Sequence, residues 1–156
     1  MEMTGMQDDT LGIVDYAHTP DGLERLLETV SGICRGKLFC VFGCGGNRDK
    51  AKRPEMGAIA TKYANRVIVT SDNPRFEDPN EIIADIKGGM DIKGKAISLF
   101  IPDRVEAIHT AILTAKPGSI VLVAGKGHED YQIIGTEKHH FNDKEVVKEW
   151  FEKFGR

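Results

Sequence analysis

Charged and amide side chains stand close together in the segment TSDNPRFEDP (70–79), directly after an apolar run. A plain surface turn requires Asn or Asp and Pro, but it does not require Arg75 three residues after Asp72. The planar guanidinium group of an arginine suits a carboxylate or a phosphate, which it can bind through two parallel hydrogen bonds. We therefore expect Asp72 to hold the side chain of Arg75 while leaving donors free for an anionic ligand.

Two further loops carry residues of this kind. The segment GCGGNRDKAKRP (43–54) contains Arg48, and GKGHEDY (125–131) contains Glu129, which can accept from an ammonium group beside the Gly125 carbonyl. Together with the arginine of the first loop, these groups suit a ligand with carboxylates and amines, such as an amino acid, or a phosphate-bearing ligand. Structural salt links among the same charges are the competing interpretation, and the residues alone leave it open.

Apolar runs alternating with amphipathic stretches indicate how these loops are positioned. The β-prone runs are 11–16, 38–42, 66–70, 96–101 and 119–124, with a closing strand or hairpin at 132–141. The helical patterns are 20–33, 54–64, a stretch from about residue 80, 103–115 and 143–154. This order predicts a single Rossmann-like α/β domain: a mostly parallel sheet of about six strands, helices on both faces and an antiparallel C-terminal strand.

Ligands of open α/β sheets bind outside the carboxyl ends of the strands. The loops rich in Gly, Asp, Arg, His and Glu follow four of the five expected parallel strands, so we expect them to meet at one edge of the sheet. The loop after the fourth strand, PDR (102–104), is plainer by comparison.

Composition narrows the function classes. A chain of 156 residues with 40% hydrophobic and 29% charged residues suits one soluble domain. A net charge of -3 gives no basic field to attract nucleic acid or acidic lipid. No apolar run approaches the ~18 residues of a membrane span, and the first ten residues lack the pattern of a signal peptide. We expect a cytoplasmic monomer that binds neither nucleic acid nor membrane.

Several common chemical motifs are missing. There is no G-x-x-x-x-G-K-[ST] phosphate loop, and Arg48 stands where a dinucleotide fingerprint needs its third glycine. The three cysteines fit no paired metal motif, so we expect reduced thiols. His18 and His128 could touch a ligand, although a lone histidine is more often structural or solvated. We predict no metal site and no complete catalytic constellation in this chain.

Four segments, in order, resemble the C-terminal domain of the Mur ligases: VDYAHTPDGLE (14–24), VFGCGGNRDKAKRPEMG (41–57), SDNPRFEDP (71–79) and VAGKGHEDYQIIG (123–135). The resemblance is greatest to the tripeptide synthetases of the family, and it implies that residues 11–156 are this domain and residues 1–10 a remnant of an interdomain linker. Family members use ATP and magnesium to form an acyl phosphate on the substrate UDP-MurNAc-L-Ala-D-Glu. The amine of an incoming amino acid then attacks the acyl phosphate.

The resemblance also implies which residues bind that amino acid. DNPR resembles the signature of family members that add meso-diaminopimelate rather than L-lysine. Lysine lacks the second carboxylate of diaminopimelate, so an arginine placed there would be left unpaired and would reject lysine. The implied diaminopimelate site consists of Arg48, Asp72, Asn73, Pro74, Arg75, Gly125 and Glu129. The residues implied on the nucleotide side are Asp15, His18 and Asn47.

The family's UDP-sugar domain, phosphate loop, modified lysine and magnesium ligands have no counterpart in this chain. We therefore interpret it as one domain of a longer enzyme, inactive alone, whose ATP and Mg²⁺ are bound mainly by the upstream ATPase and UDP-sugar domains. One alternative is the same domain from a lysine-adding, other Mur or folylpolyglutamate ligase, against which DNPR argues. A free-standing ligand-binding module is the second alternative, and the lack of an ATP-cleaving apparatus favours it.

Overall fold

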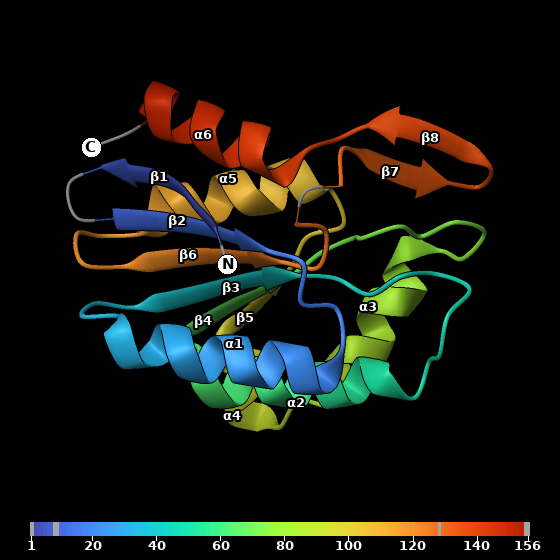
Figure 1. Cartoon of the computed structure of the whole chain (residues 1–156). Coiled ribbons are helices and arrows are strands. Elements are labelled where there is room, and N and C mark those ends of the chain that lie inside the picture. The colour runs from blue at the N-terminus through green and yellow to red at the C-terminus, as the bar shows by residue number, and fades with distance from the viewer. Residues whose placement is uncertain (1, 8–9, 128, 155–156) are drawn as a thin grey trace.

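The computed structural model describes residues 2–7, 10–127 and 129–154. The strands are β1 (Glu2–Gln7), β2 (Thr10–Asp15), β3 (Leu38–Phe42), β4 (Arg66–Val69), β5 (Ser98–Phe100), β6 (Ile120–Ala124), β7 (Tyr131–Ile134) and β8 (Glu137–His140). The helices are α1 (Pro20–Ile33), α2 (Lys52–Tyr63), α3 (Pro79–Lys87), α4 (Ile92–Ala96), α5 (Arg104–Thr114) and α6 (Asp143–Phe154). Figure 1 shows three layers, with α1, α2 and α4 on one face of the main sheet and α5 and α6 on the other.

The main sheet has six strands in the order β1-β2-β6-β3-β4-β5. Strands β2 to β6 run parallel to their neighbours, and β1 alone pairs antiparallel, with β2. The predicted α/β class, with a mostly parallel sheet and helices on both faces, is confirmed.

The closing strand or hairpin expected at 132–141 is confirmed as a hairpin. The C-terminal segment forms a separate hairpin, β7–β8, outside the main sheet, and the sheet's own antiparallel strand is β1. Glu2–Gln7, within the segment expected to be a linker remnant, form an edge strand of this sheet. The sequence EMTGMQ has one β-branched residue and a glycine, so this strand depends on pairing with β2 more than on its own propensity.

Two apolar clusters fill the space between the sheet and its helices. Strands β3 and β6 are buried along their whole length, as expected of central strands covered on both faces. Because successive side chains point to opposite faces, Cys40 and Phe42 pack in the cluster beneath α1 and α2. Phe39 and Val41 pack in the cluster beneath α5 and α6.

Side-chain caps fix where α1, α3 and α5 begin. The Thr19 side chain accepts a hydrogen bond from the N–H of Gly22 before α1, and Asp103 accepts from the first turn of α5. Asp78 caps α3, and Pro20 and Pro79 occupy first-turn positions where a missing N–H costs nothing. Helices α1, α3 and α5 thus each start just past a strand-end loop. None of the helices within the described ranges has the length and apolar character required to cross a membrane.

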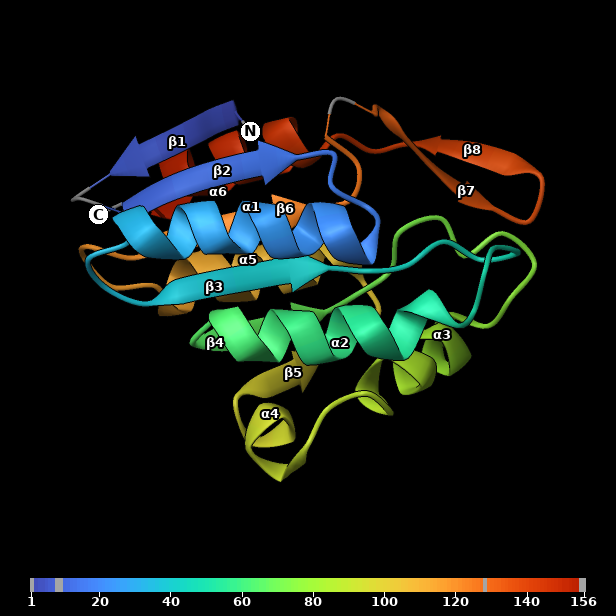
Figure 2. The ribbon, with the colours of Figure 1, turned by 60° about the horizontal axis from the view of Figure 1, so that its bottom comes forward.

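The carboxyl ends of β2, β3, β4 and β6 lie at one edge of the sheet. In Figure 1 these strands point toward the side where the β7–β8 hairpin lies, and Figure 2 shows the same edge after a 60° turn. Four loops that are distant in sequence are therefore brought together, as the sequence predicts.

Candidate functional site

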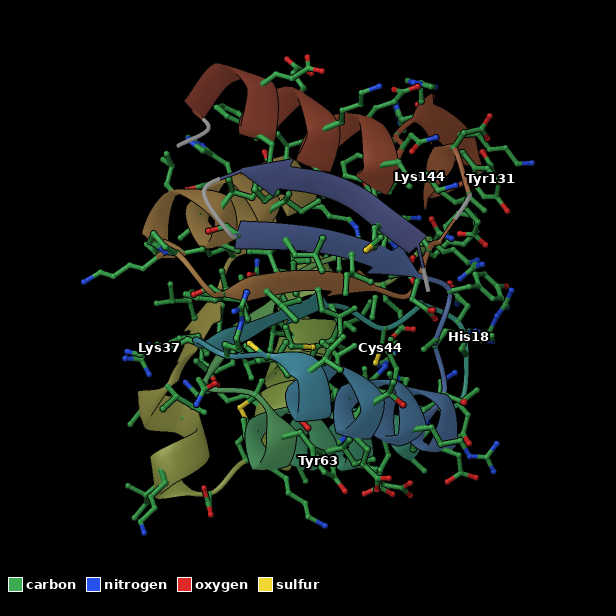
Figure 3. The ribbon with its side chains drawn as sticks, turned by 60° about the vertical axis from the view of Figure 1, so that its left-hand side comes forward. His18, Lys37, Cys44, Tyr63, Tyr131 and Lys144 are labelled. Atoms are coloured by element: carbon green, nitrogen blue, oxygen red, sulfur yellow. The ribbon has the colours of Figure 1, made fainter. Side chains whose placement is uncertain are left out.

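A cavity of about 390 Å³ opens at this edge of the sheet, a volume within the usual range for small-molecule sites. Its lining residues are Tyr16, His18, Gly43, Cys44, Gly45, Arg48, Lys52, Asp72, Asn73, Arg75, Gly125, Glu129 and Tyr131. Of the residues predicted for the amino-acid site, all except Pro74 are among them. Figure 3 shows His18 and Tyr131 toward this end of the sheet and Lys37 toward the opposite end.

Lys126 connects the loops beneath the cavity. Its side chain is fully buried, and its Nζ donates to Oδ1 of Asn73 at 2.8 Å and to the carbonyl of Tyr131 at 2.9 Å. The same ammonium lies 3.1 Å from Oδ1 of Asp72 and 3.7 Å from Oε1 of Glu129. A buried ammonium needs partners of this kind, because taking it out of water is otherwise very costly. Lys126 therefore fixes both acidic groups of the cavity.

The expected pairing of Asp72 with Arg75 is wrong. Nη1 of Arg75 donates to the carbonyl oxygens of Gly46 at 3.0 Å and Asn73 at 3.4 Å, while Asp72 faces Lys126. Within the described ranges, no ion pair joins Asp72 to Arg75. The physical reason is that buried Lys126 requires an anion more than a half-exposed arginine does. The carbonyl bonds use one nitrogen of the guanidinium, so its other donors remain for a ligand.

The loop after β4 that contains DNPR (70–78), called the DNPR loop below, is bound to the β7–β8 hairpin as if it were an additional strand. The N–H of Arg75 donates to the carbonyl of Ile133 at 3.1 Å, and the N–H of Gly135 donates to the carbonyl of Arg75 at 2.7 Å. Gln132 and Ile133 also donate to the Asp72 carbonyl and to the Asn73 side chain. These bonds hold Arg75 at a φ of 52°, a left-handed conformation that costs a non-glycine residue about 1–2 kcal/mol.

A buried arginine on α2 stabilises the glycine-rich loop after β3 (43–51). The guanidinium of Arg53 donates to Glu77 at 2.8 and 3.1 Å, to Asp85 at 2.9 Å and to the carbonyl of Gly45 at 3.0 Å. Burial disfavours the charge of Arg53, but its two carboxylate partners outweigh that effect and raise its pKa. Hydrogen bonds from Arg53 and from the N–H of Asn47 lower the pKa of Glu77 to about 2. Glu77 thus links the DNPR loop to the glycine-rich loop.

The plain loop PDR contributes a further brace that the sequence analysis missed. Arg104 is buried and forms a two-point pair with Asp143 at 2.7 and 2.8 Å. Its remaining donors reach the carbonyls of Ser71 at 2.8 Å and Ala124 at 3.2 Å. Those two carbonyls lie at the carboxyl ends of β4 and β6, directly before Asp72 and Gly125, so Arg104 sets where two cavity loops begin.

Close backbone approach explains two of the glycines. A Cβ at Gly43 would lie 2.2 Å from the carbonyl oxygen of Thr70, and one at Gly46 would lie 1.9 Å from that of Pro74. A Cβ at Gly45 would lie 3.1 Å from Nη1 of Arg75, which places the guanidinium against this loop. The run GCGG therefore allows the loop after β3 to pack on the loop after β4.

The remaining predicted residues lie around this cavity in different ways. His18 lines it and is exposed, with Nδ1 3.0 Å from the carbonyl of Tyr16. Asn47 accepts from the N–H of Phe76, which supports the DNPR loop. Asp15 accepts from the N–H of Ala17 at 2.9 Å. Asp15, Asn47 and Pro74 are not among the lining residues. His128 falls outside the described residues.

The sequence analysis did not single out several lining residues. Tyr16, Lys52 and Tyr131 lie in the loops that it identified, so position after a strand is the signal that could have found them. Burial raises the pKa of the Cys44 thiol to about 12, so this lining residue is a poor nucleophile. No group of three His, Cys, Asp or Glu side chains suited to a metal ion occurs in the described ranges.

The lining charges determine what the cavity can bind. Arg48, Lys52 and Arg75 offer cationic donors, and Asp72 and Glu129 offer carboxylates. Arg48 is exposed, and its Nη1 donates to the neighbouring Asn47 carbonyl at 3.3 Å. A zwitterion with more than one carboxylate and amine matches this mixture better than a simple anion does.

Comparison with known proteins places these observations in a family. Residues 1–127 match the family model described as "Mur ligase, glutamate ligase domain". A curated relative, the UDP-N-acetylmuramoyl-L-alanyl-D-glutamate--2,6-diaminopimelate ligase of Synechococcus elongatus, is 56% identical over 146 residues, which cover 94% of this chain and 29% of the relative. The corresponding enzyme of Bacillus cereus is 56% identical over 137 residues, covering 88% of this chain and 27% of its own length.

A solved structure agrees with these relatives. A UDP-N-acetylmuramoyl-L-alanyl-D-glutamate--2,6-diaminopimelate ligase superimposes with a TM-score of 0.93 and 46% identity, over 100% of this chain and 32% of that one. The chain therefore spans less than a third of the length of the relatives that it matches.

Proposed function

The chain belongs to the Mur ligase family, and we propose that it is the C-terminal, amino-acid-binding domain of an ATP-dependent ligase that adds meso-diaminopimelate to UDP-MurNAc-L-Ala-D-Glu. The observation that supports this proposal is the cavity at the carboxyl edge of the sheet, which is lined by Arg48 and Arg75 together with Asp72 and Glu129. In the longer protein, the amine bound here attacks the carbonyl carbon of the dipeptide's acyl phosphate and displaces inorganic phosphate, and the product is a peptidoglycan precursor.

The arrangement of donors supports a dicarboxylic amino acid. Arg75 is fixed by two carbonyls and a left-handed backbone, so its guanidinium has a defined position beside the cavity. In our proposal it pairs with the distal carboxylate of diaminopimelate, and Arg48 pairs with the second carboxylate. Glu129, whose side chain is 20% exposed, accepts from an ammonium group of the ligand, with the Gly125 carbonyl beside it.

Selection against lysine follows from the same geometry. L-Lysine has no carboxylate at the distal end of its side chain, so the Arg75 donors that face the cavity would lose water without gaining an anion. A charge-assisted hydrogen bond contributes ~1.5–3 kcal/mol. Losing one bond therefore corresponds to roughly a 10- to 100-fold preference for diaminopimelate.

ATP and Mg²⁺ are proposed to bind mainly in the other domains. The described residues offer a metal no cluster of three carboxylate, imidazole or thiolate ligands, and the sequence has no phosphate loop. ATP supplies the phosphoryl group that activates the dipeptide. This domain would contribute His18, Asp15 and Asn47 on the nucleotide side, in a cytoplasmic enzyme.

NMR titration of the isotope-labelled chain with meso-diaminopimelate and with L-lysine tests the proposal. We expect amide shifts at Asn73, Arg75 and Glu129 with diaminopimelate, and a response at least tenfold weaker with lysine. Arg75→Ala should abolish the difference, whereas Arg35→Ala, an exposed arginine at the opposite edge, should change nothing. Equal binding of both amino acids would remove the selectivity, and no shift around the cavity would contradict amino-acid binding by this chain.

A further inference from the structure

A second cavity, of about 430 Å³, opens at the opposite edge of the sheet, where β3, β4 and β5 begin and α5 ends. Figure 3 shows Lys37, one of its lining residues, at the far end of the molecule from His18 and Tyr131. None of the predicted site residues lines it. The function proposed above therefore leaves this cavity without a role.

The register of the sheet makes the floor of this cavity apolar. Phe39 pairs with Arg66, and Ile68 pairs with Leu99, so these four side chains point to the α5 face of the sheet. On that face α6 packs on β1 and β2, and α5 packs on β3, β4 and β6. The edge strand β5 is less covered, and Leu99 is 51% exposed. An apolar surface beside the end of α5 is thus left open to solvent.

The rim of this cavity is cationic. Lys37, Arg66 and Lys116 line it and are exposed, and its lining residues include no Asp or Glu. None of these three side chains forms an ion pair with another described residue. Nη1 of Arg66 donates to the neighbouring carbonyl of Asn65 at 2.9 Å. Three cations around an apolar floor attract an anion more strongly than isolated surface lysines do, because their potentials add and the low-dielectric walls focus the field.

The loops that carry two of these cations are held in place. The N–H of Gly36 donates to the carbonyl of Gly118 at 2.7 Å, and a Cβ at Gly36 would lie 2.7 Å from the carbonyl carbon of Gly118. The carbonyl of Lys37 accepts from Ile120, and that of Lys116 accepts from the N–H of Ser119. The backbone positions of both lysines are thus set by the fold before any ligand arrives.

We propose that this cavity binds a small organic anion with an apolar, aromatic-sized body and one carboxylate, sulfonate or phosphate group. The body contacts Leu99, Ile68 and Phe39, and the anionic group lies between the Lys37, Arg66 and Lys116 side chains. This site is independent of the amino-acid cavity, so its test and that of the proposed function can fail separately.

Titration of the isotope-labelled chain with 2-naphthalenesulfonate at low salt tests the proposal. We expect saturable amide shifts at Ser98, Leu99 and Lys116 and none around Arg75. Neutral 2-naphthylmethanol and cationic 2-naphthylmethylammonium, which share the ring, should bind at least tenfold more weakly. Equal affinities for the three compounds, or naphthalenesulfonate shifts centred on the amino-acid cavity, would overturn the assignment.

Substitutions to glutamate at exposed positions complete the test without disturbing the core. Lys116→Glu should weaken naphthalenesulfonate binding about tenfold, since an attraction is replaced by a repulsion at short range, and Leu99→Glu should weaken it further. Lys148→Glu, the same change at an exposed position of α6, should leave the affinity within twofold of the parent value. Unchanged affinity in Lys116→Glu would refute the site. Concentration-dependent dimerisation that shifts these same resonances without ligand would instead assign the surface to a second copy of the chain.

Discussion

Replacing Lys126 with methionine tests whether this buried ammonium organises the candidate site. The substitution keeps an unbranched side chain of similar length but removes two hydrogen bonds and the cation beside Asp72, whose side chain is 12% exposed. Removing one partner of a buried ion pair costs about 3–5 kcal/mol, because the other charge stays behind. Asn73 retains one donor, the N–H of Ile133, so the lower end of that range is expected, about 3 kcal/mol.

Urea unfolding measures this loss directly. With a slope of about 2 kcal/mol per molar urea, a loss of this size moves the midpoint down by roughly 1.5 M. The double variant Lys126→Met with Asp72→Asn removes the stranded carboxylate and should recover at least 1 kcal/mol of the loss. Lys52→Met, at a half-exposed lysine of the same cavity, should change the free energy of unfolding by no more than about 0.5 kcal/mol.

Hydrogen exchange locates the effect. In Lys126→Met the amides of the β7–β8 hairpin, such as that of Ile133, should exchange faster relative to amides of β3, because the link between the hairpin and the DNPR loop is weakened. A loss below 1 kcal/mol, or strictly additive single and double variants, would refute the idea that Lys126 and Asp72 act as a unit.

Three further predictions concern the loops and the core. Arg53 holds the folded-state pKa of Glu77 at about 2, against an ordinary value of 4.5. The stabilisation that ionised Glu77 contributes is therefore complete above about pH 4.5 and is lost as the pH falls toward 2. Urea midpoints measured from about pH 6 to about pH 2 should fall less steeply in Glu77→Gln than in the parent chain. Gly46→Ala should lower the free energy of unfolding by about 1–3 kcal/mol, because the added Cβ would lie 1.9 Å from the carbonyl oxygen of Pro74. Gly32→Ala, at a position on α1 where the added Cβ meets nothing within 4 Å, should raise the free energy of unfolding by about 0.5–1 kcal/mol. Thermal midpoints measure both changes. Cys44, whose pKa is about 12, should resist iodoacetamide at pH 8 in the folded chain and react after unfolding, as mass spectrometry would show; rapid labelling of the folded chain would contradict its burial.

Much of the architecture could be predicted from local pattern. Continuous apolar runs such as LFCVF and capped amphipathic stretches such as 103–115 specify buried strands and covering helices by themselves. The parallel order then places their carboxyl-end loops together, which is why Arg48, Arg75 and Glu129 could be assigned to one site. Strand β1 and the five-residue helix α4 escaped prediction, because short segments containing glycine depend on tertiary partners for their structure.

The partners of individual charges could not be predicted in this way. Proximity in sequence suggested that Asp72 would hold Arg75, but the ion pair is decided by Lys126, more than fifty residues further along the chain. Arg104, in the loop that looked plainest, is buried and ties two strand ends. Burial and pairing of long side chains depend on the finished packing, and a single sequence carries little local signal for either.

The attachment of the DNPR loop to the hairpin has a consequence for exchanging specificity between related proteins. Arg75, which we propose selects the substrate, stands on one segment. Its backbone is held by hydrogen bonds with Ile133 and Gly135 of another segment. Grafting residues 71–77 alone into a homologue would transfer the Arg75 side chain without the hairpin residues whose hydrogen bonds hold its backbone. The transplantable unit is discontinuous, so segments 71–77 and 126–135 would have to move together, and an evolutionary change of substrate would require linked substitutions in both.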